Sequence, residues 1–247
     1  MQRISVIARR EVASLFFSPI AYLVMFLFLL VEGFLFGMMV FVPGNLTELR
    51  MVVSFSQFGL FFIIPLMTMS LFSEEYRSGR IEMLRTSPIT ELDLVLGKFA
   101  GAMIFYIVLL GLTFIYLGLL VIFGRPDWGQ TFSSYLGLLL LGTMYVSVGL
   151  FFSACTQAQI VAAMASFLTL GFFTFAQPLS GFLPQNWGVF GQVKVPVRAI
   201  FRYLGSGSHV EDFAKGVFDT QHLVYFGGFT VLFLFMTYLV IESKKWR

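Results

Sequence analysis

The stretch FAGAMIFYIVLLGLTFIYLGLLVIF, from Phe99 to Phe123, decides the class of fold, because it contains no charged residue. A helix that crosses the hydrocarbon core of a bilayer needs roughly 20 consecutive apolar residues, and this stretch is longer than that. Backbone N–H and C=O groups inside lipid must be hydrogen-bonded within the protein, and a continuous apolar run satisfies this as a helix rather than as an alternating barrel strand. We therefore predict a transmembrane helix over residues 99–123.

Other stretches of the same character predict five more transmembrane helices, at residues 20–41, 52–72, 135–154, 160–179 and 223–241. The chain of 247 residues is 58% hydrophobic and 12% charged, and soluble domains carry about twice that share of charge. In water, such a chain would expose large apolar patches and aggregate. The sequence thus predicts an all-α integral membrane protein, with residues 1–247 forming a single transmembrane domain of six helices. The fourth and fifth helices are expected to form a tight hairpin.

The basic residues predict the orientation, because lysine and arginine gather on the cytoplasmic side of membrane proteins. Most of the 16 basic residues fall on the cytoplasmic side if the N-terminus lies there. Most of the remainder lie in one long segment, residues 180–222, where charge is a weak topological signal. Both termini are therefore predicted to be cytoplasmic. The formal charge of +3 is too small and too scattered to indicate a nucleic-acid partner.

Two of the polar segments predict helices outside the spans. Residues 1–18 place apolar side chains at near-helical spacing among arginines, which predicts an amphipathic helix at the cytoplasmic membrane interface. Residues 180–222 form an extracytoplasmic loop that is expected to contain two short helices. One helix is expected after Pro196, and Ser208 with Glu211 predicts a capping box at the start of the other.

The longest cytoplasmic loop, residues 73–98, has charged residues interleaved with apolar ones, which predicts a short amphipathic helix. Ser87-Pro88 is expected to end it, and Thr90 with Asp93 predicts a capping box that starts the helix entering the third span. Periodicity alone leaves two interpretations open. The loop is either a solvated connector or a segment that couples to a partner protein.

The residues that catalysis would require are missing from the sequence. The only Gly-Lys pair, Gly97-Lys98, lacks the upstream glycine of a phosphate-binding P-loop. His209 and His222 are not one helical turn apart, as the zinc ligands of a helical metalloprotease would be. The single cysteine, Cys155, excludes an internal disulfide. We therefore expect no catalytic residue, no metal site and no cofactor of the chain's own, and no enzymatic activity.

Glu32 is the one acidic residue well inside a predicted span. An ionisable group at the centre of a bilayer costs roughly 2.5–3.5 kcal/mol on insertion scales, so it faces protein or water rather than lipid. It either lines a polar path or contacts a partner, or it is a protonated acid bonded to a nearby carbonyl. One carboxylate is little support for a proton-coupled transporter, whose pathways usually contain several such groups.

Four blocks of residues follow one another along the whole chain: Arg9-Arg10-Glu11 with Ser18-Pro19-Ile20-Ala21-Tyr22; Pro65-Leu66-Met67-Thr68-Met69 through Phe72-Ser73-Glu74-Glu75 to Leu96-Gly97-Lys98; Ser153 with Thr156-Gln157 and Gln159-Ile160-Val161-Ala162-Ala163; and His209, Glu211, Phe213 and Gly216 with Tyr225-Phe226, ending in Glu242 to Arg247. Together they resemble the type-2 family of ABC exporter permeases. The nearest relatives are expected among the gliding-motility permeases and those that serve nitrous-oxide reductase maturation.

This resemblance implies a dimer of six-helix permeases, either homomeric or heteromeric, each resting on a separate cytoplasmic ABC ATPase that binds the ATP. It also implies that the loop 73–98 contains the coupling helix, which docks in a groove of that ATPase. The residues expected at this interface are Glu74, Glu75, Arg77, Arg80, Ile81, Glu82, Met83, Leu84 and Arg85.

The function predicted from this resemblance is that of the permease subunit of an ATP-driven exporter in a bacterial inner membrane. Two alternatives remain open at this point, a secondary transporter that works without ATP and a membrane anchor or assembly subunit that transports nothing. The sequence leaves open the substrate, the role of Glu32, the role of the loop 180–222 and the presence of accessory subunits.

Overall fold

The computed structural model describes residues 2–40, 49–80, 90–123, 127–182, 187–189, 193–195 and 197–244. The helices that build the six spans are α2 (Pro19–Val40), α3 (Leu49–Thr68) with α4 (Ser70–Arg77), α6 (Glu91–Leu112) with α7 (Phe114–Phe123), α8 (Trp128–Cys155), α9 (Gln159–Ser180) and α12 (Thr220–Ser243). The other elements are α1 (Gln2–Phe16), β1 (Trp187–Val189), β2 (Val193–Val195), α10 (Val197–Leu204) and α11 (Ser206–Ala214).

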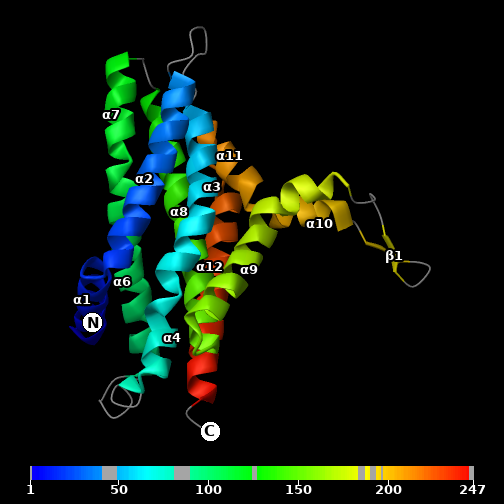
Figure 1. Cartoon of the computed structure of the whole chain (residues 1–247). Helices are drawn as coiled ribbons and strands as arrows, with labels where there is room; N and C mark the ends of the chain where they lie inside the picture. Colours follow the sequence, from blue (N-terminus) through cyan, green and yellow to red (C-terminus); the bar gives the residue numbers. More distant parts are fainter. Residues whose placement is uncertain are drawn as a thin grey trace.

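Six helical stretches are long and apolar enough to cross a membrane, which confirms the predicted number of spans. α1, α4 and the C-terminal end of α12 lie at one end of the bundle, which we call the inner end (Figure 1). The sequence predicts this end to be cytoplasmic. α11 lies toward the opposite, outer end, and the orientation in a bilayer stays a prediction.

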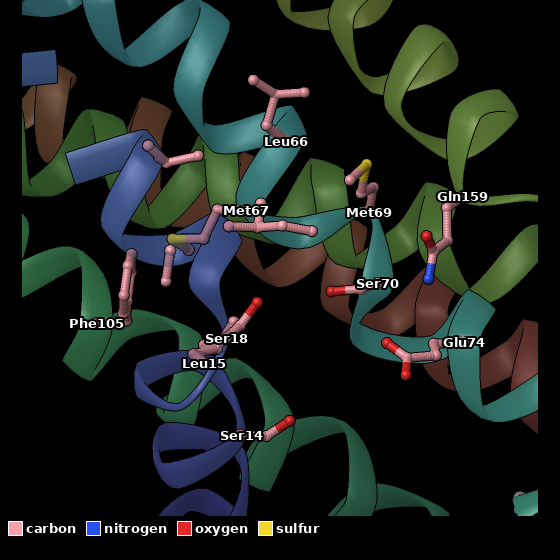
Figure 2. Close-up of a pocket in the computed structure, with 13 residues that line it drawn as sticks. Ser14, Leu15, Ser18, Leu66, Met67, Met69, Ser70, Glu74, Phe105 and Gln159 are labelled. Atoms are coloured by element: carbon pink, nitrogen blue, oxygen red, sulfur yellow. The ribbon is translucent and has the colours of Figure 1, made fainter. Parts of the chain in front are cut away.

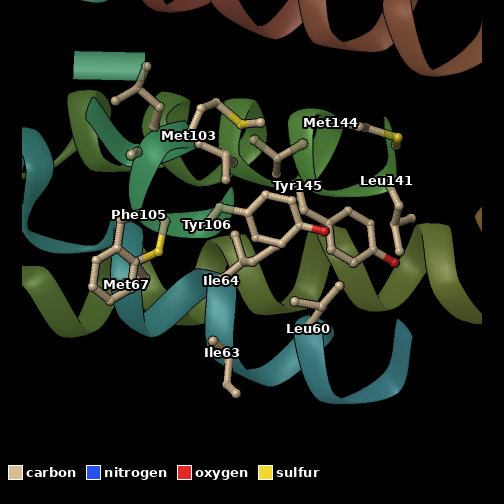
Figure 3. Packing of buried hydrophobic residues seen from close by; sticks show 14 of the residues in the cluster. Leu60, Ile63, Ile64, Met67, Met103, Phe105, Tyr106, Leu141, Met144 and Tyr145 are labelled. Carbon is tan, nitrogen blue, oxygen red and sulfur yellow. The ribbon is translucent and has the colours of Figure 1, made fainter. Parts of the chain in front are cut away.

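The fourth span, α8, is the centre of the bundle. It contacts α3, α4, α6, α9, α11 and α12, and 67% of its most apolar stretch is buried, against 28% for the first, fifth and sixth spans. Its glycines let neighbours approach closely: the ring of the buried Tyr106 on α6 occupies the space beside Gly142. Tyr106 and Tyr145 lie together in this core (Figure 3), and the Tyr106 hydroxyl donates to the Leu138 carbonyl at 2.6 Å.

The second span is interrupted between α3 and α4. Pro65 lies in the last turn of α3, and the helix stops at Thr68 before restarting at Ser70. Ser153 of α8 compensates for this interruption. Its hydroxyl accepts hydrogen bonds from the N–H groups of Phe72 (2.9 Å) and Ser73 (3.2 Å), which satisfies donors that a helix start leaves unpaired.

The predicted amphipathic helix over residues 74–85 is wrong in its boundaries. α4 carries Glu74 to Arg77 as the end of the second span and stops there. The chain turns at Ser78 and at Gly79, whose φ of 71° lies in the left-handed region that glycine adopts without steric cost. A turn therefore separates Glu74 to Arg77 from Arg80, and the predicted helix beyond Arg80 lies outside the described residues.

Two sequence predictions at helix starts had different outcomes. The capping box at α6 is confirmed, because Thr90 Oγ1 accepts from the Asp93 N–H at 3.2 Å and the Asp93 carboxylate accepts from the Thr90 N–H at 3.3 Å. The capping box at Ser208 is wrong, because α11 begins earlier, after Gly205. A Cβ at Gly205 would lie 2.6 Å from the Gln177 Cβ, so the close packing of this glycine against α9 places the helix start.

The segment between the fifth and sixth spans contains the two expected short helices, α10 and α11. α9 leans away from the other spans toward the outer end, and α10 packs against it (Figure 1). The antiparallel hairpin β1–β2 extends to the side of the bundle. The sequence had not predicted this hairpin, and the rest of the described secondary structure is helical.

Candidate functional site

Four charged side chains from three helices meet at the inner end, and we call them the inner cluster: Arg10 and Glu11 of α1, Glu75 of α4, and Lys98 of α6. Lys98 is completely buried, and Glu11 and Glu75 are 7% exposed. The two positive and two negative charges balance, as buried charges must if they are to be tolerated. The cluster therefore ties the N-terminal helix to the second and third spans.

Lys98 is the centre of the inner cluster. Its Nζ atom donates to Glu11 Oε1 at 2.9 Å and to the Leu71 carbonyl at 2.6 Å. It also lies 2.9 Å from Glu75 Oε2, an ion pair without the alignment of a hydrogen bond. The same Nζ lies 5.0 Å from the centre of the Phe72 ring, within the range of a cation–π interaction. All the partners that a buried ammonium requires are thus provided by α1 and α4.

Arg10 closes the inner cluster on its solvent side. Its guanidinium donates to Glu75 Oε1 at 2.6 Å and to Glu11 Oε1 at 3.0 Å, while about half of its side chain stays exposed. Partial burial opposes the charge on Arg10, but the hydrogen bonds and charges of the two glutamates outweigh it and raise the pKa of Arg10 above its usual range. The guanidinium therefore stays charged across the physiological pH range.

Two glycines explain why α1 can approach α6 closely enough to form the cluster. A Cβ at Gly97 would lie 2.7 Å from the Ile7 Cβ, and one at Gly101 would lie 2.7 Å from the Glu11 Cβ. Real Cβ atoms do not approach other carbons so closely. The predicted N-terminal helix is thus confirmed as a helix, and it packs through its buried face against the start of the third span. Its location at a membrane interface stays a prediction.

A second ion pair lies on the surface next to the inner cluster. Arg80 Nη2 lies 3.0 Å from Glu74 Oε1, with 59% of the Arg80 side chain and 48% of the Glu74 side chain exposed. A cavity of about 430 Å³ separates this pair from the cluster, and both Glu74 and Glu75 line it. Glu74 and Glu75 are neighbours on one short helix, but Glu74 is exposed to solvent and Glu75 is buried.

The structure divides the predicted interface residues into three groups. Glu74, Arg77 and Arg80 are exposed at the inner end, where a partner can reach them. Glu75 is buried in the inner cluster, so it is a structural member of the chain's own fold rather than an exposed contact. The remaining five, Ile81, Glu82, Met83, Leu84 and Arg85, lie outside the described residues.

Sequence reasoning missed Glu11 and Lys98 as a pair. The signal was present for Glu11, because it lies four residues after Ile7 and four before Leu15, on the apolar face of the N-terminal helix. An ionisable residue on an apolar face indicates a buried partner of opposite charge. Lys98 directly precedes the long uncharged run 99–123. A basic residue at the start of a span was therefore a candidate partner for Glu11.

A second cavity of about 100 Å³ lies near the inner cluster, and Figure 2 shows the residues that line it. Its walls come from the end of α1, the start of α2 and the junction of α3 with α4. Ser14, Leu15, Ser70 and Glu74 line both this cavity and the larger one. The two cavities therefore meet between α1 and α4.

Glu32 lies far along α2 from the inner cluster and is 3% exposed. Its side chain is hydrogen-bonded to Ser56 of α3, and its Oε1 atom has no hydrogen-bond partner among the described residues. A cavity of about 20 Å³ beside it, lined also by Tyr116 and Tyr135, is large enough for one water molecule. This environment suits a protonated acid that is bonded locally.

We predict that Glu32→Gln leaves transport intact and changes the free energy of unfolding by less than about 1 kcal/mol, because an amide keeps the volume and the hydrogen bond to Ser56. Transport and unfolding by SDS titration in the same membrane preparation measure the two effects. Glu32→Leu, which keeps the size but removes both polar atoms, is the matched comparison. Loss of transport in Glu32→Gln would by itself show that the carboxyl proton takes part in the cycle.

No group of three or more histidine, cysteine, aspartate or glutamate side chains in the described parts of the chain is arranged to hold a metal ion. The site is instead a set of charged contacts at the inner end.

Comparison with known families gives one match. A family model described as ABC-2 type transporter matches residues 2–191, which include α1, the first five spans and all four residues of the inner cluster. No curated protein matches the chain.

Proposed function

The chain belongs to the ABC-2 type transporter family, and we propose that it is the permease of an ATP-driven exporter. The chain is the multi-pass membrane subunit, which lacks the ATPase site. It acts as a dimer in a bacterial inner membrane. A separate cytoplasmic ATPase chain docks at its inner end and supplies the energy.

The observation that carries this proposal is the geometry of α4. Glu74 and Arg80 form an exposed ion pair that a partner can contact, and Glu75, the next residue after Glu74, is buried against Lys98. A force applied to the exposed pair is therefore passed directly to the inner cluster, because Glu74 of the pair is bonded to Glu75 of the cluster along the backbone. A solvated connector would not need a buried ion pair directly behind its surface.

From the inner cluster, two routes lead into the bundle. Lys98 and Glu11 connect α4 to α6 and to α1. Ser153 connects the start of α4 to the central span α8 through its hydrogen bonds to Phe72 and Ser73. A shift of α4 thus moves three spans together, which is what a two-state element biased by a partner's nucleotide cycle requires.

The exposed spans support a dimer. Only 28% of the most apolar stretch is buried in each of the first, fifth and sixth spans, so these helices present apolar faces to lipid or to a second permease. The orientation of the inner end toward the cytoplasm agrees with the distribution of basic residues.

Charge reversal at Arg80 tests the proposal. With the ATPase reconstituted beside the permease, we expect Arg80→Glu to lower the permease-stimulated ATPase rate and the transport rate at least about tenfold, because like charges at an interface cost several kcal/mol. The unfolding free energy is expected to change by less than about 1 kcal/mol, because the Glu74–Arg80 pair is exposed.

Arg198→Glu, a charge reversal on exposed α10, is the matched control and is expected to leave both rates unchanged. Full stimulated activity in Arg80→Glu would contradict docking at α4. Transport that proceeds without any ATPase would instead favour a secondary transporter, and an ATPase complex that moves no substrate would favour an assembly subunit.

A further inference from the structure

Two buried histidines meet toward the outer end, far from the inner cluster. His209 of α11 and His222 of α12 are 4% and 7% exposed, and their Nδ1 atoms are 2.6 Å apart. They are the only two histidines of the chain. At this distance one nitrogen must carry a hydrogen and the other a lone pair, since two N–H groups or two lone pairs would repel. The contact therefore holds one shared proton.

The neighbouring groups assign the protons. His209 Nε2 lies 3.0 Å from the carbonyl oxygen of Tyr203, which can only accept, so this nitrogen is the donor. A neutral His209 then has its lone pair on Nδ1, and His222 Nδ1 donates to it. The remaining nitrogen, His222 Nε2, lies 3.5 Å from Asp212 Oδ2. The result is a chain of four groups from α10, α11 and α12.

The surroundings of the pair are mostly aromatic. The Tyr225 ring of α12 stacks on His209 with centroids 4.1 Å apart, and the Tyr203 ring of α10 lies edge-on at 5.4 Å. Asp212 and Glu211 of α11 are charged groups nearby, and Lys215 directly follows this helix. Lys215 Nζ lies 3.4 Å from Asp212 Oδ1 and 3.7 Å from Glu211 Oε1, and Asp219 caps the start of α12.

Three other helices packed against α11 contribute uncharged hydrogen-bonding groups. Gln57 of α3 donates to Ser206 at 3.4 Å, and Gln130 of α8 donates to the Ala214 carbonyl at 2.6 Å. Phe173 of α9 accepts a hydrogen bond from Ser206 through its carbonyl. Asp212 is thus the carboxylate that faces His222, and no second base competes for the shared proton at these contacts.

We propose that His209 and His222 form a proton-binding site that fastens α11 to the start of α12 through one shared proton and opens when His209 takes up a proton of its own. A proton that binds His209 can enter only at Nδ1, which places two N–H groups face to face and breaks the contact.

The direction of the pH effect follows from the environment of His209. Burial lowers its pKa from the ordinary value of 6.5, and the neighbouring His222 adds to this, while the bond to the Tyr203 carbonyl opposes it. A histidine whose pKa is lower in the folded state stabilises the fold fully above pH 6.5 and loses that contribution as the pH falls below it. The contact is therefore closed at neutral pH and opens in acid on the outer side.

Because the chain has no other histidine, selective ¹⁵N-histidine labelling reports on this site alone. The full chain is purified through a tag without histidine, placed in lipid nanodiscs and titrated from pH 8 to pH 4 by NMR. We expect His209 protonated on Nε2 and His222 on Nδ1 at high pH, and we expect His209 to take up a second proton only below pH 6.5. Protonation of His209 near pH 6.5, with both tautomers averaged as in free histidine, would overturn the proposal.

His222→Gln tests the coupling. A glutamine side chain can turn to donate to His209 or to accept from it, so it removes the opposing N–H group. We expect the titration of His209 to move up by at least about one pH unit, a tenfold change in proton affinity. Gln221→Ala, an exposed neighbour on the same turn, is the matched control and is expected to leave the titration of His209 in place. An unchanged titration of His209 in His222→Gln would also overturn the proposal.

Asp212→Asn gives a second, milder variant at a partly exposed position. It is expected to move the titration of His209 to lower pH, because the charge of Asp212 counteracts the effect of burial on the pKa of His209. An unchanged titration of His209 would show that Asp212 does not act on the pair and would contradict the proposed chain of groups.

Discussion

Lys98→Met is expected to destabilise the protein by about 3–5 kcal/mol, because it removes one member of a buried ion cluster and leaves the others without compensation. Lys98 is completely buried, and its Nζ atom contacts Glu11, Glu75 and the Leu71 carbonyl. Methionine has a similar length, so the loss of charge rather than of volume dominates. Unfolding by SDS titration in mixed micelles measures the change in free energy.

The rescue of this variant separates electrostatics from packing. In Lys98→Met, Glu11 and Glu75 share the single positive charge of Arg10. Adding Glu75→Gln removes the excess negative charge and leaves the Arg10–Glu11 ion pair in place, so we expect the double variant to be more stable than Lys98→Met alone. Lys215→Met, on the exposed part of α11, is the control and is expected to cost less than about 1 kcal/mol. Wild-type stability in Lys98→Met would contradict a structural role for the inner cluster.

Gly142→Ala is the second substitution with a large expected effect. The added Cβ would lie 2.1 Å from two ring carbons of Tyr106, whose ring is fully buried and whose hydroxyl is bonded to the Leu138 carbonyl. The ring cannot turn away without breaking that bond. We expect a loss of about 1–3 kcal/mol or more from overpacking, together with reduced yield of folded protein.

Gly228→Ala is the matched control for this prediction, because a Cβ at Gly228 of α12 meets nothing within 4 Å. It is expected to change the unfolding free energy by less than about 1 kcal/mol, in the stabilising direction that alanine gives to helices. Equal effects of the two substitutions would show that α6 and α8 are less closely packed than Gly142 and Tyr106 indicate.

The sequence was sufficient for the six spans, because each is a continuous apolar run whose length alone matches the bilayer. It was also sufficient for the capping box at Thr90, since that motif acts over four residues. The start of α11 was wrong by three residues, because the close packing of Gly205 against Gln177 decides it, and such a tertiary contact leaves no local pattern.

The candidate site could be predicted only in part, for two physical reasons. Glu74 and Glu75 are adjacent and chemically identical, and only the packing of α4 shows which of them points inward. Glu11 and Lys98 are 87 residues apart, so their contact depends on how α1 meets α6. The contact between His209 and His222 likewise depends on tertiary packing, because it forms only when α11 lies against the start of α12.

The 87-residue separation of Glu11 and Lys98 also sets an order of assembly during biosynthesis. A ribosome that adds about 5–20 residues per second makes Lys98 roughly 4–17 seconds after Glu11. During that interval α1 lacks its partner Lys98 of α6, and its charges keep it out of the hydrocarbon core while the first two spans enter the bilayer. The inner end of the permease is therefore completed only after the third span has begun to emerge.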